Sequence, residues 1–363
     1  MGAPLRIADA GFFDSVRHSR KILLIVFGGL GDIVHQVPAL RSVRLNFPDA
    51  RIEVLTPAGG ADILRGLEGI DRVIPHFGRQ AGWNWSNLKQ FWELFRARYD
   101  LCIDFWGSNH SSLVALTTAA PARLGRRPSG ESKIGWRICP THVAIYPYLL
   151  EPMYVQWTSM LEQLGFRVDR QFVLKPDPER FAATGIAPGL RGRYIHLSPN
   201  AGDPARELAL PLLAQVVDGL ARALPDHPLV ISNAATPRQQ QYLQDLLGAI
   251  RTPPLRVFAG SLDIRGLMAL IQNAALHLSA DSGPVHLAVA AGTPSVSWFL
   301  KNPGMLEYLP EGARHFAFVV DEPRGGGISG IAAEDIVARC VEKLRRAAAI
   351  PAGTDPAPAV EAG

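Results

Sequence analysis

The sequence predicts an α/β protein with two parallel sheets, and three observations lead to this fold class. Short apolar strands alternate with helical segments, which is typical of parallel sheets connected by crossover helices. The alternation is interrupted by a Pro- and Gly-rich stretch, residues 176–192, and then begins again. The chain has 363 residues, 47% of them hydrophobic, which is enough for two α/β domains with separate cores.

The first half opens with a βαβ unit. We expect a buried strand at residues 21–27, a helix at 33–45 and a second strand at 51–55. The loop between the first strand and the helix is glycine-rich, but Val34 fills the third glycine position of the dinucleotide-binding fingerprint. A nicotinamide cofactor is therefore disfavoured. The sheet continues with a strand at 99–105, in which Asp104 is expected to hold nearby loops, and with helices at 111–119 and 158–164.

The second half has the same alternation, with strands predicted at 194–198, 229–232, 276–279 and 294–299. After the strand at 276–279, Asp281 and Ser282 are expected to cap a helix whose first turn holds Pro284. Gly283 lets a ligand approach the backbone, and the helix start presents N–H groups that suit a diphosphate. The alternative interpretation is an ordinary capped turn between a strand and a helix.

Composition narrows the function classes. The formal net charge is +4, from 37 Lys and Arg against 33 Asp and Glu, which suits an anionic partner without requiring nucleic acid. The three cysteines lack metal-binding spacing, so we expect thiols in a reducing compartment and no metal site. No apolar run approaches the roughly 18 residues of a membrane span, and no signal peptide is evident. We therefore expect a cytoplasmic protein.

Motifs in both halves resemble one known family. The first half contains Gly31-Asp32, then Pro38-Ala-Leu40, then Phe47-Pro-Asp-Ala-Arg-Ile52. The second half contains Ser198-Pro-Asn-Ala201 followed by Arg206, and then Asp281-Ser-Gly-Pro-Val-His286. In this order, the motifs resemble the heptosyltransferases, glycosyltransferase family 9, over about residues 21–346.

The resemblance implies the GT-B fold, in which two Rossmann-like, doubly wound domains face a central cleft. On this basis residues 1–20 are a disordered leader and 21–175 an acceptor-binding domain. Residues 176–192 are a linker, 193–346 a nucleotide-sugar-binding domain, and 347–363 a disordered tail. In the leader, Phe12 and Phe13 beside basic residues are also compatible with a peripheral contact at the cytoplasmic face of the inner membrane.

The resemblance also implies roles for individual residues. Asp32 is expected to be the base that takes a proton from the acceptor, although it could only cap the first helix. Arg206 is expected to contact the donor phosphates, although it could be a surface arginine. The rest of the donor site is expected to comprise Asp281, Ser282, Gly283 and His286, the last of which could equally be a half-buried helix histidine.

One segment departs from the family pattern. Where the family usually has a turn with Thr-Asp-Pro, this chain has Leu300-Lys301-Asn302-Pro303. Lys301 could add a contact to the donor diphosphate, or the exchange could change which sugar or nucleotide is accepted. The donor suggested by the family, ADP-heptose, is thereby put in doubt, whereas transfer from a nucleotide sugar is not.

A basic loop region is the candidate acceptor site. Arginine binds carboxylates and phosphates through two hydrogen bonds, and both groups occur on lipopolysaccharide inner core. The alternative is a solvated charged loop, since Glu131 lies within the region. The candidate residues are Arg79, Arg126, Arg127, Lys133 and Arg137.

The sequence thus leads to one principal functional hypothesis. According to this hypothesis, the protein is an inverting glycosyltransferase that uses neither a cofactor nor a metal. It moves heptose from ADP-heptose to a lipopolysaccharide core or a related anionic, lipid-linked saccharide. The alternatives are a transferase or epimerase of the same fold that uses another nucleotide sugar, and a non-catalytic saccharide-binding relative.

Overall fold

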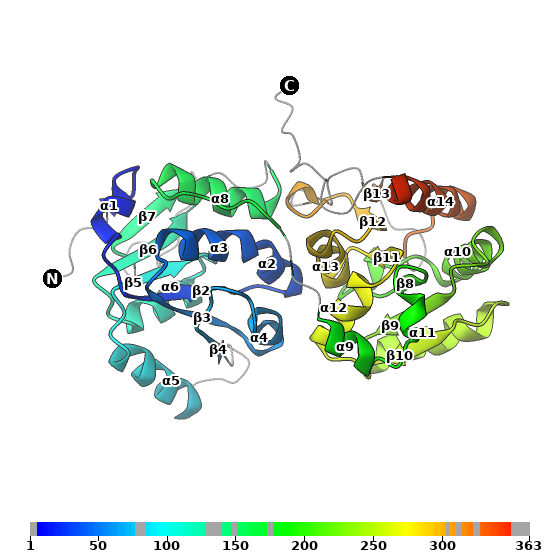
Figure 1. Cartoon of the computed structure of the whole chain (residues 1–363), viewed down its shortest axis with the longest axis horizontal. Helices are drawn as coiled ribbons and strands as arrows, with labels where there is room; N and C mark the ends of the chain where they lie inside the picture. The colour runs from blue at the N-terminus through cyan, green and yellow to red at the C-terminus, as the bar shows by residue number, and fades with distance from the viewer. Residues whose placement is uncertain are drawn as a thin grey trace, which may run out of the picture. The chain divides into compact units, whose positions relative to one another are not determined.

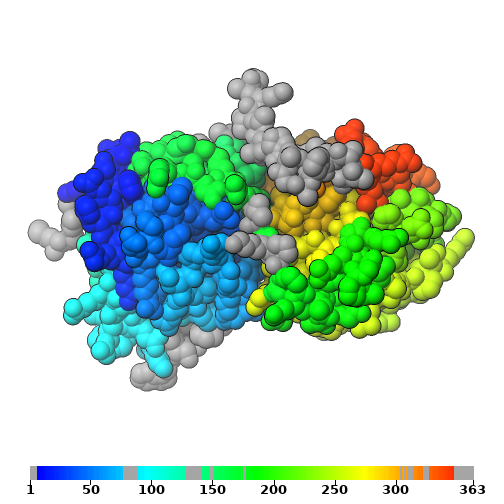
Figure 2. Space-filling model, in the orientation of Figure 1, coloured from blue at the N-terminus to red at the C-terminus, as the bar shows by residue number. Residues whose placement is uncertain are grey.

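The structure is a computed structural model that describes residues 6–76, 85–127, 140–146, 151–172, 174, 177–302, 305–309, 314–321 and 327–349. The chain divides into unit 1, residues 1–172, and unit 2, residues 173–363, coloured blue to green and green to red in Figure 2. Each unit has its own parallel sheet with helices on it (Figure 1). The predicted fold class, α/β with two doubly wound sheets, is confirmed.

The sheet of unit 1 has the strand order β1-β7-β6-β5-β2-β3-β4. Its strands are β1 (Arg6–Ile7), β2 (Lys21–Ile25), β3 (Arg51–Pro57), β4 (Arg72–His76), β5 (Leu101–Asp104), β6 (Ala122–Arg127) and β7 (His142–Ile145). Its helices are α1 (Phe12–Val16), α2 (Leu30–His35), α3 (Val37–Asn46), α4 (Ala58–Leu64), α5 (Trp85–Arg96), α6 (Asn109–Thr117) and α8 (Met153–Gln163).

The strand order of unit 1 reverses between β2 and β5. After β2, the chain adds β3 and β4 on one side, and it then returns to add β5, β6 and β7 on the other. In open α/β sheets, ligands bind at the carboxyl ends of the strands where the order reverses. A short loop after β2 leads to Asp32 in the first turn of α2, and Asp104 ends β5, so both lie at this position.

The predicted helix at 33–45 is divided in two. The structure instead has α2 and α3, which meet at Gln36. Pro38, in the first turn of α3, has no N–H to continue the hydrogen-bond pattern of α2, which explains the break. The Gln36 side chain fills the junction by donating to the carbonyl oxygens of Phe27 and Asp32, at 3.1 and 3.0 Å.

Residues 1–20 were expected to form a disordered leader, but much of this segment is folded. β1 pairs with β7, and α1 buries Phe12 and Val16. Phe12 and Phe13 pack against Phe166 at ring-centroid distances of 6.4 and 5.0 Å. Phe12 and Val16 therefore belong to the core of unit 1, whereas Ile7 of β1 is exposed.

The sheet of unit 2 has the strand order β10-β9-β8-β11-β12-β13. Its strands are β8 (Ile195–Ser198), β9 (Leu229–Asn233), β10 (Arg256–Ala259), β11 (Leu276–Ala280), β12 (Ser295–Leu300) and β13 (His315–Val320). Its α-helices are α9 (Pro178–Ala183), α10 (Leu210–Ala223), α11 (Pro237–Ala249), α12 (Ile264–Gln272), α13 (Gly283–Ala291) and α14 (Ala333–Ala349), joined by the 3₁₀ turns η2 (Pro188–Leu190), η3 (Pro204–Arg206) and η4 (Met305–Glu307).

Alternate side chains of β8 and β11 lie on opposite faces of the sheet, as the period of a strand requires. Leu197 and Leu278 pack with α10, α11 and α14 in one core cluster. His196 and His277 alternate with them and contact each other, with their Nδ1 atoms 3.0 Å apart. The sheet therefore has one apolar face and one face with a buried polar row.

The segment 176–192, expected to be a linker, contains α9 and η2. Phe181 of α9 lies in a core cluster with residues of α12 and β10. Asp177 caps α9 by accepting from the Arg180 N–H at 3.1 Å. Thus α9 packs onto unit 2. The predicted tail at 347–363 lies outside the described residues except for the last turn of α14.

Candidate functional site

The strand order of unit 2 also reverses once, between β8 and β11. Ser198 at the end of β8 is paired with Ser279 of β11, so the loops that follow the two strands begin side by side. One loop leads to Arg206, and the other contains Asp281. The sequence motifs of the second half therefore meet where parallel α/β sheets bind ligands.

Arg206 and Asp281 form an ion pair across this position. The Nη1 atom of Arg206 lies 3.2 Å from Oδ2 of Asp281. Burial raises the pKa of Asp281, and the Arg206 guanidinium opposes that shift. The structure thus brings together two expected donor-site residues that are 75 positions apart in the sequence.

The loop that presents Arg206 is held by a buried carboxylate. Glu207, which is 3% exposed, accepts the Ala201 N–H at 2.8 Å. Both of its oxygens also accept from Arg238 at 2.9 Å, and Arg238 donates to the Ala201 carbonyl oxygen at 2.7 Å. Arg206 therefore extends from a loop whose backbone is fixed at both ends.

The start of α13 lies directly after Asp281. Ser282 occupies the cap position with an extended backbone, but its side chain makes no cap hydrogen bond, contrary to the prediction. Its hydroxyl instead donates to the Ala280 carbonyl oxygen at 3.2 Å. Because no side chain caps this helix of nine residues, the N–H groups of its first turn and its positive dipole end remain suited to an anion.

His286 lies in the first turns of α13 and is 4% exposed. Its ring packs against Tyr308 with the centroids 5.6 Å apart. Burial lowers the pKa of His286 to about 4, so the imidazole is neutral at physiological pH. Of the two interpretations, the structure agrees with a buried helix histidine, and any contact with a ligand would be made by a neutral ring.

Lys301 lies beyond the end of β12. Its ammonium pairs with Asp321 at 2.9 Å, and both side chains are exposed. Its backbone N–H donates to the Val320 carbonyl oxygen at 2.8 Å, as a continuation of the pairing of β12 with β13. Lys301 is thus engaged at the surface, one strand away from the Arg206–Asp281 pair.

In unit 1, Asp32 is the third residue of α2 and not its cap residue. Its Oδ2 atom accepts the Gly29 N–H at 2.6 Å. Gly28 has a φ of +117°, and a Cβ atom there would lie 2.4 Å from Cβ of Asp32. The glycine is therefore required both by the backbone conformation and by the close approach of the Asp32 side chain.

Asp104 has the loop-holding role that the sequence predicts. It accepts the N–H groups of Trp106 and Gly107 at 3.1 and 3.0 Å and the hydroxyl of Ser111 at 2.8 Å. Burial raises its pKa to about 6, although these hydrogen bonds lower it. The carboxylate thereby fixes the turn between β5 and α6, close to the reversal point of unit 1.

The expected acceptor residues have different environments. Arg126 lies in β6, and not in a loop, and is 0% exposed. Its guanidinium stacks on Trp157 at 4.1 Å from the ring centroid and donates to Gln156. Arg127, the next residue of the strand, is partly exposed. The other three, Arg79, Lys133 and Arg137, lie outside the described residues.

The sequence analysis did not identify a histidine pair in unit 1. The Nε2 atoms of His76 and His110 are 2.8 Å apart, and both rings stack on Phe27, which lies two residues beyond the carboxyl end of β2. The Nδ1 atom of His76 contacts the side-chain oxygen of Gln90 at 2.6 Å. The pair was missed because it depends on β4, which has little apolar periodicity and was not predicted.

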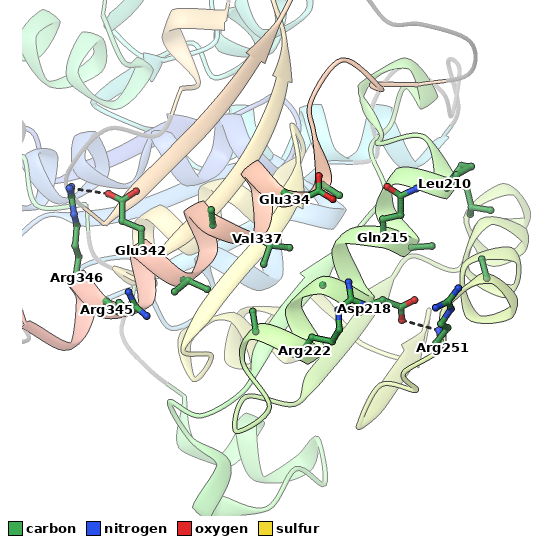
Figure 3. A pocket seen from close by; sticks show the side chains of 18 residues that line it. Leu210, Gln215, Asp218, Arg222, Arg251, Glu334, Val337, Glu342, Arg345 and Arg346 are labelled. Atoms are coloured by element: carbon green, nitrogen blue, oxygen red, sulfur yellow. Dashed lines mark hydrogen bonds and ion pairs between the residues drawn. The ribbon is translucent and has the colours of Figure 1, made fainter.

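A cavity of about 1170 Å³ lies between α10 and α14 of unit 2, away from the reversal point of that unit (Figure 3). Its lining is mainly small and apolar side chains of the two helices, with charged groups at its rim. Two of these charges are already engaged: Glu342 pairs with Arg346 at 3.0 Å, and Asp218 accepts the Arg251 N–H at 2.9 Å. None of the predicted site residues lines this cavity.

Within the described ranges, no group of three or more His, Cys, Asp or Glu side chains could hold a metal ion. In the same part of the chain, no helix is long and apolar enough to cross a membrane.

The chain is similar to several known proteins. A family model for glycosyltransferase family 9 (heptosyltransferase) matches residues 88–306. Lipopolysaccharide heptosyltransferase 3 of Escherichia coli is 24% identical over 277 residues, which cover 74% of this chain and 80% of that protein. The lipopolysaccharide core heptosyltransferase OpsX of Haemophilus influenzae is 18% identical over 288 residues, or 77% of this chain and 79% of that protein.

Solved structures have the same fold. A glycosyltransferase of family 9 from Veillonella parvula superposes with a TM-score of 0.74 at 20% identity, covering 90% of this chain and 97% of that one. The ADP-heptose lipopolysaccharide heptosyltransferase II of E. coli has a TM-score of 0.71 at 20% identity, covering 90% and 99%. The family match extends through both units.

Proposed function

The chain belongs to glycosyltransferase family 9, and we propose that it is an inverting, metal-independent transferase that moves heptose from ADP-heptose to a lipopolysaccharide core or a related surface saccharide. The observation that carries the proposal is the Arg206–Asp281 ion pair beside the uncapped start of α13. A nucleotide diphosphate is typically bound by a cationic side chain, by a helix N-terminus and by a stretch of backbone that the phosphates can approach closely. All three lie together at the carboxyl ends of these strands.

The leaving diphosphate is the first chemical requirement of the transfer. As the bond to the sugar breaks, negative charge develops on the diphosphate and must be stabilised. In the proposed site, Arg206 and the N–H groups at Ser282 and Gly283 supply that stabilisation, while Asp281 orients the guanidinium. His286 contributes a neutral imidazole, and Lys301 would have to leave Asp321 to reach the donor.

The second requirement is a base for the acceptor hydroxyl. We assign this role to Asp32, because the family motif places it there and its carboxylate is oriented by the Gly29 N–H. A positioned base removes the proton as the hydroxyl attacks, typically contributing about 10²–10⁴ in rate. Inversion follows when the hydroxyl attacks on the face opposite to the leaving diphosphate.

The acceptor is proposed to be an anionic, lipid-linked saccharide. Among the described acceptor candidates, Arg127 keeps an exposed portion, whereas Arg126 is buried and stacks on Trp157. Arg79, Lys133 and Arg137 remain candidates from the sequence. Arginine can hold phosphate or carboxylate groups of such an acceptor through paired hydrogen bonds.

A second candidate function is transfer of a different sugar, or epimerisation of a nucleotide sugar. The observation that favours it is the segment after β12, where Lys301 pairs with Asp321 and replaces the acidic residue that is usual in the family. This change alters the charge beside the donor site and leaves the Arg206–Asp281 pair intact. The two candidates therefore differ in sugar and nucleotide but use the same diphosphate site.

A panel of nucleotide sugars distinguishes these candidates. ADP-heptose, ADP-glucose, UDP-glucose and GDP-mannose are compared by thermal shift, since a ligand that binds only the folded protein raises its melting temperature. Product analysis with a lipopolysaccharide core acceptor then follows, with and without a chelator. We expect ADP-heptose to give the largest shift and the transferred product in both conditions.

Two arginine variants test whether the nucleotide sugar binds at the proposed site. Arg206→Ala should reduce the thermal shift and the transfer rate, whereas Arg346→Ala, which removes a surface arginine paired with Glu342, should change neither. No shift with any of the four donors would contradict nucleotide-sugar binding. Activity that is lost in chelator and restored by magnesium would contradict metal independence.

A further inference from the structure

Asn200 has a buried side-chain amide that makes no hydrogen bond within the described residues. It lies two residues beyond the end of β8 and is 8% exposed. Within the part of the chain that the structure describes, neither its amide nitrogen nor its amide oxygen has a hydrogen-bond partner. Buried amides are nearly always paired, because an unsatisfied one costs free energy. A polar group kept in this state calls for a partner that the folded chain itself does not supply.

The backbone around Asn200 is fixed, so the arrangement is not that of a loose loop. The next residue, Ala201, donates its N–H to Glu207 at 2.8 Å and accepts from Arg238 and Gln239 at 2.7 and 3.3 Å. Pro199 restrains the chain on the other side. These contacts hold Asn200 in place while leaving its own amide unsatisfied.

The register of the sheet places Asn200 beside the donor site. Ser198 of β8 is paired with Ser279 of β11. Asn200 and Asp281 each lie two residues beyond those paired serines, on neighbouring strands that run in the same direction. Asn200 therefore lies at the same edge of the sheet as Asp281, Arg206 and the start of α13.

We propose that Asn200 is a donor-binding residue that contacts the nucleotide sugar at two points. Its amide nitrogen donates to a diphosphate oxygen, and its amide oxygen accepts from a hydroxyl of the same ligand. The diphosphate of a nucleotide sugar offers acceptors to the amide nitrogen, and its ribose and sugar hydroxyls offer donors to the amide oxygen. The inference rests on the proposed nucleotide-sugar site and adds a residue that recognises both the diphosphate and a neighbouring hydroxyl.

The test compares binding with stability, because a ligand contact and a structural contact predict opposite results. ADP, UDP and GDP are titrated calorimetrically into wild type, Asn200→Ala and Asn200→Asp, and the melting temperature of each free protein is measured. For the diphosphate that wild type binds best, Asn200→Ala should weaken binding by about 10- to 100-fold, as for the loss of a hydrogen bond to a charged group. Asn200→Asp should weaken it further, because it places a carboxylate against the phosphates.

The melting temperature of free Asn200→Ala should equal or exceed that of wild type, because the substitution removes an unsatisfied buried group. Asn273→Ala is the matched control. Asn273 lies just before the other end of β11 and its amide donates to the Ala269 carbonyl oxygen at 2.8 Å. The control should lower the melting temperature and leave nucleotide binding unchanged.

The outcomes separate this inference from the proposed function. If wild type binds none of the three diphosphates, both are overturned. If wild type binds and Arg206→Ala weakens binding while Asn200→Ala does not, only the role of Asn200 is overturned. A fall in the melting temperature of free Asn200→Ala as large as that of Asn273→Ala also overturns it, because the side chain would then stabilise the free protein.

Discussion

At the scale of single residues, Asp32 has two tasks that one carboxylate can perform together. One oxygen accepts the Gly29 N–H at 2.6 Å, which orients the side chain at the start of α2. The proposed catalytic task is to take a proton from the acceptor hydroxyl. A substitution that keeps the first task and removes the second can separate them.

Asp32→Asn is that substitution, because the amide oxygen can still accept from Gly29 but cannot take a proton at neutral pH. Turnover should fall by about 10²–10⁴-fold with donor affinity little changed. The measurement is initial-rate kinetics at saturating acceptor, together with titration of the donor. Asp100→Asn is the control, since Asp100 also accepts backbone N–H groups, at 2.8 and 2.9 Å, but precedes β5 at the opposite edge of the sheet. Near-normal turnover of Asp32→Asn would leave Asp32 with the structural task alone.

Single residues also show where sequence reasoning succeeds and where it cannot. Arg206 and Asp281 could be predicted because each belongs to a short local motif, and the sheet brings them to 3.2 Å. Arg126 was predicted to lie in a basic loop that binds the acceptor, because its neighbours are basic, yet it lies in β6 and is buried against Trp157. Its partner is 31 positions away, and Asn200 likewise acquires its burial only from the tertiary structure. Local patterns contain no information on such contacts.

At the scale of elements, the glycine-rich turn before α2 depends on which glycine stands where. Gly28 has a φ of +117°, and a Cβ atom there would lie 2.4 Å from Cβ and 2.6 Å from Oδ2 of Asp32. Gly29 has a φ of −74°, and a Cβ atom there would lie 3.4 Å from the same oxygen. Two adjacent glycines thus face very different steric demands.

Gly28→Ala should therefore destabilise the protein by roughly 1–3 kcal/mol, as expected for a residue forced into a sparsely populated conformation. It should also reduce turnover by at least about 10-fold, because Asp32 is displaced from its position. Gly29→Ala should stay close to wild type in both measurements. Urea unfolding and initial rates test the pair, and equal behaviour of the two variants would contradict the steric account.

Elements were predicted in proportion to how much apolar surface they bury. The central strands β2, β5, β8 and β11 are runs of buried residues, so the prediction found each of them within a few positions. The edge strands β4 and β13 and the inner strand β6 contain His or Arg and have partly exposed positions, and they were not predicted. The helix predicted at 33–45 is divided because Pro38 lacks an N–H.

At the scale of the whole molecule, buried histidines make stability depend on pH. Burial lowers the pKa of His196 and His315 to about 3 and that of His286 to about 4, and it also lowers the pKa of His277. In the unfolded chain each returns to its ordinary value of 6.5. The unfolded state therefore binds protons below pH 6.5 that the folded state does not bind. Stability is fully present above pH 6.5 and decreases as the pH falls toward 4.

Acidification from pH 8 to pH 5 should thus lower the free energy of unfolding by about 2 kcal/mol for each of His196, His286 and His315. His315→Gln should remove one such contribution and make the dependence on pH less steep. His227→Gln, which changes a partly exposed histidine of the same unit, should leave it as in wild type. Urea unfolding at pH 8, 6.5 and 5 measures the slopes, and parallel slopes for wild type and His315→Gln would refute this explanation.

The strand order of unit 2 has a consequence for how the protein folds during synthesis. β8, β9 and β10 are adjacent in the chain and in the sheet, as are β11, β12 and β13, so each half can assemble from near neighbours. The junction between the halves joins His196 to His277 across 81 positions, and contacts this distant in sequence form slowly. The edge of β8 therefore stays unpaired until β11 has been synthesised and has left the ribosome. The proposed nucleotide-sugar site lies on that junction, so it is complete only when the two halves of the sheet have joined.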